Sequence, residues 1–479
     1  MKLNVIPTPK GVSCKEKVLF FDPALRHGDF DAEALVFAEQ MKKCTGENLT
    51  FADNGISTVK TDLLYPGEYR LTADSEGVTV YAFDSDGASY AFATLLQLSR
   101  IRDGKLILPA LTVWDSPDFG YRGLMIDCAR SFHTLDELKK YVDLCYFYKV
   151  KYLHIHFSDD ESYTLPSEKF PKLSTEGKCF TFAEIAELDE YAASRHVGII
   201  PEVDTPGHST AILKAYPEIF GKEGIITFSE KAVGAVGDIY REICAMFPHS
   251  EYIHIGGDES RLGWWLDNDE CTEFGKKCGF SIDDDAPGMT GAEYIMLRYL
   301  AYFIKSNAEA VLSCGKRPIV WEGFHKATNG MVPKEAAVMV FDSSYQLPGE
   351  LLEGGFEIIN CSWLPTYVVT PTWFYPLEDC YNWDVCSYGT INDASPYKNG
   401  MMRLAPDEKM IGGQLSSWGD TIEKAFPTKE DGHRDELEKI RERLPFISEN
   451  LWNREKIRAF PDINAALRET DAVLGKLLK

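Results

Sequence analysis

The chain has 479 residues, of which 44% are hydrophobic and 26% charged, and its net charge is −24. This length predicts two or three domains, and the composition is typical of a globular protein with a sizeable core. So strong a negative charge repels phosphate backbones, and we therefore expect no nucleic-acid partner. No run of about 18 apolar residues occurs, so we also expect no membrane span.

The twelve cysteines are scattered, and no two of them form a Cys-x-x-Cys pair. This spacing excludes a zinc ribbon. The first residues, which read Met1-Lys-Leu-Asn-Val-Ile-Pro-Thr-Pro, lack the apolar run of a signal peptide. We therefore expect a cytoplasmic location with reduced thiols. The oligomeric state cannot be predicted from these features.

Residues 1–115 are predicted to form a small α+β domain. Short alternating runs separated by turn residues indicate strands, and two amphipathic stretches indicate helices. The expected strands are Val18–Phe21, Tyr69–Thr72 and Val78–Ala82, and the expected helices are Asp31–Cys44 and Ala88–Leu98. No combination of residues with a catalytic pattern occurs in this segment, so we interpret it as structural.

Residues 116–425 are predicted to form an α/β catalytic domain, a (β/α)8 TIM barrel. Eight short apolar runs alternate with longer amphipathic stretches. The expected strands are Leu124–Asp127, Tyr152–Phe157, Gly198–Val203, Tyr252–Ile255, Ile319–Glu322, Val338–Phe341, Glu357–Asn360 and Met410–Gln414. The clearest helices are Leu135–Tyr148, Phe182–His196 and Ala292–Cys314. An open doubly wound sheet is the alternative, although no Gly-x-Gly-x-x-Gly loop supports a nucleotide-binding version of it.

Residues 426–479 are predicted to form a helical C-terminal extension packed on the outside of the barrel. Charged helical patterns cover Arg434–Leu444 and Ala459–Leu478. No internal repeat and no low-complexity segment occurs in the chain.

Polar and aromatic residues follow most of the predicted barrel strands, where a TIM barrel carries its active site. They include Asp127, Arg130, Asp159, Asp160, Asp204, His208, Asp258, Glu259, Trp321, Trp363, Tyr367, Trp418 and Asp420. Any one of them has an ordinary explanation as a helix cap or a solvated loop residue. Their occurrence together after successive strands predicts a single functional rim.

The pair Asp258-Glu259 follows a buried-strand pattern that ends in Gly256-Gly257. Successive strand residues point to opposite faces of a sheet. Two glycines let the backbone bend, so that both carboxyl groups can face one pocket. Paired carboxylates beside aromatic side chains suggest glycoside chemistry.

These residues carry a family resemblance that covers most of the chain. The sequence resembles the family 20 glycoside hydrolases, which are exo-acting β-N-acetylhexosaminidases. The matching blocks, in the family's order, are Arg122-Gly-Leu-Met-Ile-Asp-Cys-Ala-Arg130, Leu153-His-Ile-His-Phe-Ser-Asp-Asp160, Pro201-Glu-Val-Asp-Thr-Pro-Gly-His208, His254-Ile-Gly-Gly-Asp-Glu259, Val320-Trp-Glu322 and Gly413-Gln-Leu-Ser-Ser-Trp418. The N-terminal domain resembles the small domain of these enzymes. The resemblance implies a glycan substrate that ends in a β-linked N-acetylhexosamine, and it implies no cofactor.

The resemblance also implies a role for each matched residue. Glu259 would be the general acid and later the general base, with Asp159 and His208 as a relay that sets its pKa near the working pH. Asp258 would hold the 2-acetamido group of the substrate, whose own oxygen attacks the anomeric carbon. Tyr367 would donate a hydrogen bond to that oxygen. The remaining contacts to the sugar would come from Arg130, Trp321, Trp418, Asp420 and Phe341.

Three positions depart from the family pattern. Phe341 stands where a third Trp wall is usual, and Asp420 stands where a longer Glu binds a sugar hydroxyl. Val369 stands where many members have an Asp or Asn that contacts the 6-hydroxyl. We therefore expect an enzyme that requires the 2-acetamido group but tolerates changes at the 4- and 6-positions. Nearby loop residues such as Trp373 or Trp383 could instead supply replacement contacts.

Two alternatives remain open at this point. His154-x-His156 places two imidazoles on one strand face, which is a metal-ligand spacing and would suit a metal-dependent barrel hydrolase. Hydrogen-bonded histidines inside the barrel are the simpler explanation, so we expect no metal. The other alternative is a non-catalytic sugar-binding relative that kept the pocket.

Overall fold

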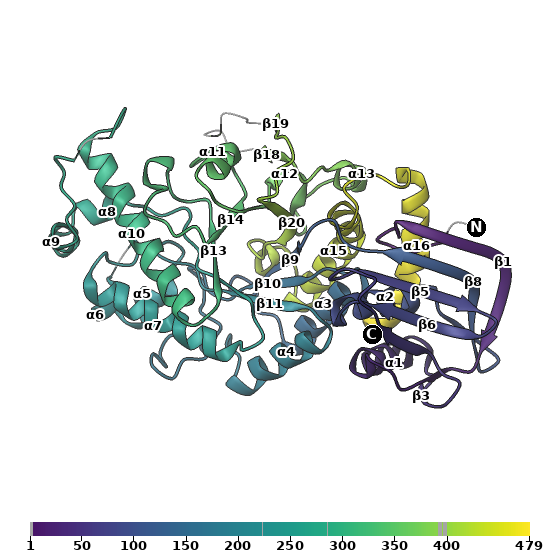
Figure 1. Ribbon diagram of the computed structural model, residues 1–479. Helices are drawn as coiled ribbons and strands as arrows, with labels where there is room; N and C mark the ends of the chain where they lie inside the picture. Colours follow the sequence, from purple (N-terminus) through teal and green to yellow (C-terminus); the bar gives the residue numbers. More distant parts are fainter. Residues whose placement is uncertain (1–2, 223, 285, 391–394, 396–399) are drawn as a thin grey trace.

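A computed structural model describes residues 3–222, 224–284, 286–390, 395 and 400–479. It consists of an N-terminal sheet with helices on one face, a barrel of parallel strands, and two long C-terminal helices (Figure 1). The helix α2 (Ser85–Leu98) packs between the N-terminal sheet and the barrel, where it contacts both the strand β5 (Tyr69–Asp74) and the barrel helix α3 (Leu135–Phe147). The helix α1 (Asp31–Thr45) packs beside α2.

The N-terminal sheet has the strand order β1-β8-β5-β6-β4, with β7 paired to β8. Its strands are β1 (Gly11–Phe21), β4 (Ser57–Lys60), β5 (Tyr69–Asp74), β6 (Gly77–Ala82), β7 (Arg100–Arg102) and β8 (Lys105–Asp115), and a small separate sheet pairs β2 (Ala24–Leu25) with β3 (Thr50–Phe51). The three expected strands lie within β1, β5 and β6. The sequence pattern missed β8, although β8 pairs with β1, β5 and β7.

Eight parallel strands form a closed barrel, as expected. They are β9 (Tyr121–Asp127), β10 (Tyr152–His156), β11 (Gly198–Glu202), β12 (Tyr252–His254), β13 (Arg317–Trp321), β14 (Ala337–Val340), β15 (Ile358–Asn360) and β20 (Met410–Ser417). The pairing of β20 with β9 closes the barrel, with Gln414 opposite Gly123. The TIM barrel is therefore confirmed, and the open doubly wound sheet is excluded.

Most barrel strands are followed by helices on the outside of the barrel. These are α3 (Leu135–Phe147), α4 (Phe182–Ser194), α5 (Thr210–Ala215), α6 (Pro217–Phe220), α7 (Glu230–Met246), α8 (Gly263–Leu266), α9 (Asp269–Lys277), α10 (Gly291–Ser313) and α11 (Pro348–Glu353). The capping box of Thr181 and Glu184 starts α4, as its sequence indicates. Between β13 and β14 the described chain forms a single 3-10 helix, η1 (Lys326–Thr328).

The segment between β15 and β20 carries short elements at the active-site end of the barrel. They are α12 (Trp363–Thr366), β16 (Tyr367–Val369), β17 (Trp373–Phe374), α13 (Leu377–Asn382), β18 (Ser387–Thr390) and β19 (Gly400–Arg403). The short strand β16 pairs with the end of β20 in parallel and with β17 in antiparallel orientation. This pairing extends the barrel sheet beyond the C-terminal end of β20.

After β20, α14 (Ile422–Ala425) leads into α15 (Lys429–Trp452) and α16 (Phe460–Leu477). The helix α15 is longer than expected, because it continues through the buried Pro445 at which the sequence pattern ended. It packs against both β20 and β9, so it occupies the place of the eighth barrel helix. By contrast, α16 contacts α1, α3 and α15. The domain boundaries at 115 and 425 stay a prediction.

A buried ion pair joins the N-terminal sheet to the barrel. Lys149 Nζ lies 3.0 Å from Asp115 Oδ2 and 2.9 Å from the hydroxyl of Tyr69, and both charged side chains are fully buried. The other oxygen of Asp115 accepts a 2.8 Å hydrogen bond from the indole of Trp452, the last residue of α15. One carboxylate thus connects the sheet, the α3–β10 turn and the C-terminal helix.

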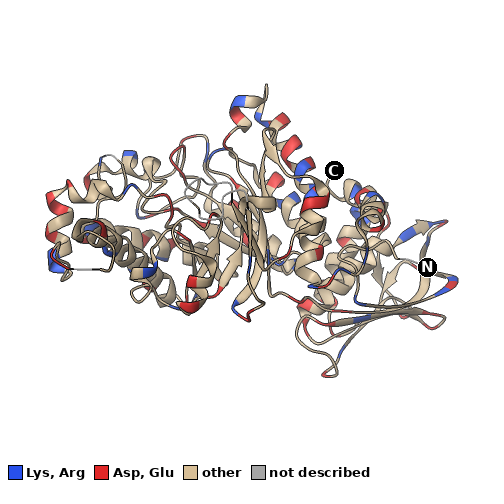
Figure 2. Cartoon of the chain, turned by 90° about the horizontal axis from the view of Figure 1, so that it is seen from above, with Lys and Arg blue, Asp and Glu red and all other residues tan. Residues whose placement is uncertain are grey.

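Acidic residues are spread over the helices of all parts of the chain and alternate with Lys and Arg (Figure 2). The twelve cysteines are free thiols. Among the described residues, no helix combines the length and apolar content needed to cross a membrane.

Candidate active site

A cavity of about 360 Å³ opens at the C-terminal ends of the barrel strands. All ten site residues expected from the sequence line it, namely Arg130, Asp159, His208, Asp258, Glu259, Trp321, Phe341, Tyr367, Trp418 and Asp420. They come from loops after different strands, so the closed barrel brings together residues that lie far apart in the sequence. The volume is in the range of small-molecule sites.

The carboxylate pair is held at the end of β12 by the two preceding glycines. Gly256 and Gly257 have φ values of +67° and +112°. A Cβ atom at Gly256 would lie 1.7 Å from Asp204 Oδ1, and one at Gly257 would lie 2.7 Å from a methyl group of Val320. Only glycine therefore allows this bend, which directs Asp258 and Glu259 into the same cavity.

Glu259, His208 and Asp159 form a chain of contacts along the cavity wall. His208 Nε2 lies 3.2 Å from Glu259 Oε2, and His208 Nδ1 lies 3.2 Å from Asp159 Oδ1. Both His208 and Glu259 have positive φ values, +46° and +43°. Positive φ values in non-glycine residues are uncommon and cluster at functional sites, although Lys149 and His196, outside this cavity, also have them.

The charges of these three side chains determine which of them carries a proton in the free protein. Burial lowers the pKa of His208, but hydrogen bonds to Asp159 and Glu259 outweigh burial and raise it well above its ordinary value. The hydrogen bond from His208 in turn lowers the pKa of Glu259. We expected this relay to set the pKa of Glu259 near the working pH. In the open cavity, where the side chain of Glu259 is 54% exposed, the shift is downward.

Asp258 lies in a different environment from its neighbour. Its side chain is buried, and burial raises the pKa of Asp258 to about 6 although the nearby His208 lowers it. Asp204 lies beside it, and burial together with the charge of Asp258 raises the pKa of Asp204 well above its ordinary value. Among the described residues, none donates a hydrogen bond to Asp258 Oδ1. This oxygen is available to accept an N–H from a ligand.

Aromatic side chains line another part of the same cavity. The rings of Trp321 and Trp418 are 6.1 Å apart, those of Tyr367 and Trp418 are 6.0 Å apart, and those of Trp321 and Phe341 are 5.8 Å apart. Tyr367 and Phe341 are almost fully buried. Such walls pack against apolar faces and methyl groups of a ligand.

Arg130 crosses the floor of the cavity on the side of the first barrel strand. Its guanidinium lies 3.0 Å from Asp127, 2.6 Å from Asp159 and 3.5 Å from Asp420. These carboxylates fix the orientation of the guanidinium, and Arg130 and Asp420 both line the cavity. Val369 and the rings of Trp363 and Trp373 line the neighbouring part of the cavity.

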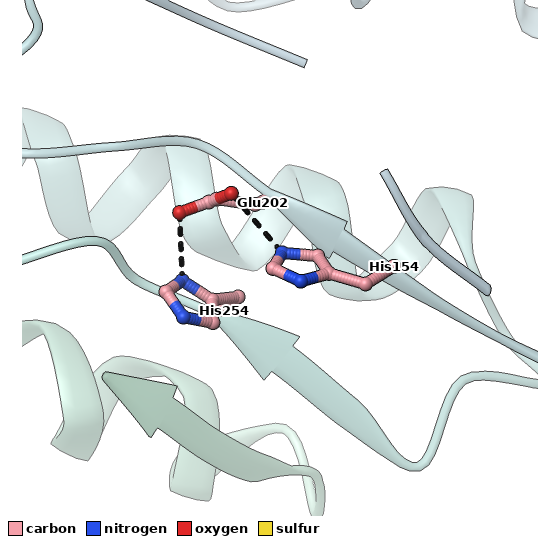
Figure 3. A group of neighbouring side chains, drawn as sticks. All are labelled: His154, Glu202 and His254. Carbon is pink, nitrogen blue, oxygen red and sulfur yellow. Dashed lines mark ion pairs between the residues drawn. The ribbon is translucent and has the colours of Figure 1, made fainter. Parts of the chain in front are cut away.

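Below the cavity, the barrel interior holds a buried cluster around Glu202. Its two carboxylate oxygens lie 3.0 Å from His154 and 3.0 Å from His254 (Figure 3). The same oxygens lie 2.6 Å from the indole nitrogen of Trp321 and 2.6 Å from Nδ1 of His156. His154, Glu202 and His254 lie close enough together to hold a metal ion. Each oxygen of Glu202 accepts a short hydrogen bond, from Trp321 or from His156. His154 Nδ1 contacts the amide of Gln414 at 3.2 Å, whereas Nε2 of His154 and Nε2 of His254 have no hydrogen-bond partner among the described residues.

Sequence reasoning did not assign roles to Asp204 and Glu202. Asp204 stands in the motif that we quoted, but its contact with Asp258 depends on the bend at Gly256. A charged residue inside the apolar run Gly198–Val203 was the available signal for Glu202, because a buried carboxylate needs partners. The described residues His156, Trp363, Val369 and Trp373 complete the lining of the cavity.

Curated relatives match long parts of the chain. A "Beta-hexosaminidase" of Vibrio furnissii is 31% identical over 353 residues, which are 66% of this chain and 55% of the relative. A "Beta-hexosaminidase" of Porphyromonas gingivalis is 29% identical over 397 residues, which are 74% of this chain and 48% of the relative. The chain thus spans about half the length of these two proteins.

Solved structures share the whole fold. The exo β-N-acetylglucosaminidase of Vibrio harveyi, in complex with N-acetylglucosamine, has a TM-score of 0.82 at 22% identity and covers 99% of this chain and 77% of its own. A chitobiase of Flavobacterium johnsoniae has a TM-score of 0.77 at 25% identity, with 99% and 73% covered.

Two family models divide the chain as the two parts of the fold do. The model "Glycosyl hydrolase family 20, domain 2" matches residues 2–116. The model "Glycosyl hydrolase family 20, catalytic domain" matches residues 119–454, which include α15 as the eighth barrel helix. Together with the cavity at the end of the barrel, this match shows that the chain belongs to glycosyl hydrolase family 20.

Proposed function

We propose that this protein is a retaining exo-glycosidase that removes terminal, non-reducing β-linked N-acetylhexosamine from glycans. The observation that carries the proposal is the contrast between two adjacent carboxyl groups. Glu259 is half-exposed and contacts His208, whereas Asp258 is buried and has a free acceptor oxygen. Two carboxyl groups in different environments can take two different roles in one reaction.

Glu259 stands at the open side of the cavity, where it can reach the bridging oxygen of a bound glycoside. In the proposed first step, the carbonyl oxygen of the substrate's acetamido group attacks the anomeric carbon while the bond to the leaving oxygen breaks. Glu259 gives its proton to that leaving oxygen. Substrate binding expels water from around Glu259 and so raises its pKa toward the value a general acid needs.

Asp258 and the aromatic wall suit the acetamido group itself. Asp258 Oδ1 would accept the amide N–H and stabilise the positive charge that the group acquires. Tyr367 would donate its hydroxyl proton to the amide oxygen, and Trp321 and Trp418 would enclose the methyl group. In the second step, Glu259 takes a proton from water, which opens the cyclic intermediate with retention of the β configuration. Both the acid and the nucleophile are present in the complex, so the reaction needs no cofactor.

The test is hydrolysis of an aryl β-N-acetylglucosaminide, with the configuration of the released sugar followed by NMR. We expect release of the β anomer first, and we expect activity to survive a strong chelator. No hydrolysis, with the sugar still bound, would indicate the sugar-binding alternative. Activity that disappears with the chelator and returns with a metal would indicate the metal-dependent hydrolase.

A further inference from the structure

Glu202 lies beneath the cavity without lining it, yet it contacts two parts of the proposed machinery. It is the last residue of β11 and is fully buried. One oxygen accepts the indole N–H of Trp321 at 2.6 Å, and Trp321 forms part of the cavity wall. The other oxygen lies 2.6 Å from Nδ1 of His156.

His156 continues the contact toward the acid. Its Nε2 lies 2.9 Å from Asp159 Oδ2, and Asp159 Oδ1 lies 3.2 Å from His208. His208 contacts Glu259. The ring of His156 also lies edge-on to Trp418 at 5.3 Å. An uninterrupted series of contacts therefore runs from the aromatic wall through Glu202 to Glu259.

We propose that Glu202 is a positioning residue for the hydrolysis proposed above, because its two oxygens hold the indole of Trp321 and the imidazole of His156 in place. Through Trp321 it orients the wall that would enclose the acetamido methyl group. Through His156 it supports Asp159 and His208, which contact the proposed acid. The inference rests on the proposed function.

The charges around Glu202 agree with this arrangement. Burial raises the pKa of Glu202, but His254, His156 and His154 outweigh burial and lower it well below its ordinary value. Burial lowers the pKa of His156, but Glu202 and Asp159 raise it well above its ordinary value. Burial lowers the pKa of His254 to about 4 although Glu202 raises it. Other charged groups near Glu202 and His156 include Asp127, Asp204 and Asp258, and Arg130 pairs with Asp159.

A carboxylate that only fills space in the core would not contact both Trp321, which lines the cavity, and His156, which contacts Asp159. Gln in place of Glu202 keeps the shape but removes the negative charge and can accept only through its carbonyl oxygen. His156 would then lose its main counter-ion, and its pKa would fall toward or below the ordinary value of about 6.5. A titration that the native protein does not show would appear near neutral pH.

The experiment compares kcat and KM over pH for the wild type and for Glu202→Gln. We expect kcat/KM to fall by about tenfold to a hundredfold, by analogy with the loss of an outer hydrogen-bond partner of a metal-bound histidine. We also expect a new limb, in which kcat/KM declines as pH rises through the lowered pKa of His156. Two further variants separate the two contacts. Trp321→Phe should lower kcat/KM without the new limb, and Glu202→Gln combined with His156→Gln should lack it.

Glu449→Gln is the matched control, because Glu449 is also a buried carboxylate and accepts a 2.6 Å hydrogen bond from the backbone of Thr8, away from the cavity. It should keep the wild-type pH profile. A Glu202→Gln profile parallel to that of the wild type would overturn the proposal. Stoichiometric zinc in the wild type, absent from Glu202→Gln, would overturn it in favour of a metal ligand. An inactive wild type would instead refute the proposed function. If Glu202→Gln does not fold, Trp321→Phe and His156→Gln decide, because each removes one partner of Glu202. A wild-type kcat/KM in both variants would overturn the proposal.

Discussion

His208 Nε2 lies 3.2 Å from Glu259 Oε2, and this contact lowers the pKa of the carboxyl group that would act as the acid. In the free protein the two side chains therefore form an ion pair. A leaving group must displace this pairing before it can take a proton from Glu259. The strength of proton donation thus depends on how fully the substrate excludes water from the cavity.

Removal of the acid should have an effect that depends on the leaving group. Glu259→Gln should lower kcat by about 10²–10⁴-fold for glycans with poor leaving groups, because the proton must then come from water. Activated aryl glycosides need little proton donation and should lose much less. Steady-state kinetics on both substrate types measures the difference. Equal and small losses on both would show that another residue is the acid.

Asp258 should produce the acid limb of the pH profile. Burial raises its pKa to about 6, and only its ionised form can stabilise a positively charged acetamido group. The kcat/KM value should therefore decrease as the pH falls through about 6. Asp204→Leu removes a hydrogen-bond donor that lowers the pKa of Asp258, so the limb should move to higher pH. Asp204→Asn keeps an N–H donor and should leave it in place. A limb that does not respond to Asp204→Leu would contradict the pairing.

The acetamido group itself should be the nucleophile. Replacement of its acetyl by trifluoroacetyl withdraws electrons from the carbonyl oxygen and should slow hydrolysis steeply. Asp258→Asn should lower kcat while the thermal unfolding midpoint remains close to that of the wild type. Denaturing mass spectrometry of the protein with slow substrates provides the critical observation. A sugar bound covalently to a carboxylate would exclude the proposed mechanism.

Hydroxyl recognition should be loose at the 4- and 6-positions. Val369 cannot accept a hydrogen bond from a 6-hydroxyl, and it lines the cavity beside Trp373. The loss of one neutral hydrogen bond costs about 1 kcal/mol, so aryl β-GlcNAc, β-GalNAc and 6-deoxy-β-GlcNAc should differ modestly in kcat/KM. A decrease in kcat/KM beyond about a hundredfold for the 6-deoxy sugar, about 2.7 kcal/mol, would mean that a buried polar group forms a hydrogen bond with the 6-hydroxyl.

The junction between the sheet and the barrel should be important for stability but not for chemistry. Lys149→Met leaves the buried Asp115 without its cation and should lower the free energy of unfolding by about 3–5 kcal/mol. Lys10→Met removes a partly exposed ion pair with Asp118 and should cost at most about 1 kcal/mol. Denaturant titration of both variants measures this contrast. Both folded variants should keep the wild-type kcat, and equal small losses of stability would contradict the role of the buried pair.

The barrel could be predicted from the sequence because each of its strands is a short apolar run whose position does not depend on distant residues. The rim residues could be predicted for the same reason, since they follow the strands directly. Glu202 and Asp204 were not assigned roles, because their partners lie on neighbouring strands. The local signal for Glu202, a charged residue inside an apolar run, does not identify those partners. The predicted helix ended too early, at Leu444, because Pro445 removes an N–H donor and usually ends a helix. In the structure, packing against β20 and β9 stabilises α15 beyond this proline.

The position of α15 also affects the order in which the barrel can fold during synthesis. The strands that close the barrel, β9 and β20, both depend on a helix that ends only at Trp452. A nascent chain that has just completed β20 therefore still exposes the apolar outer faces of the first and last strands. We therefore expect the barrel to complete its packing only after α15 has been synthesised, because transiently exposed apolar surface favours aggregation. Expression of fragments that stop before residue 452 should accordingly yield insoluble protein.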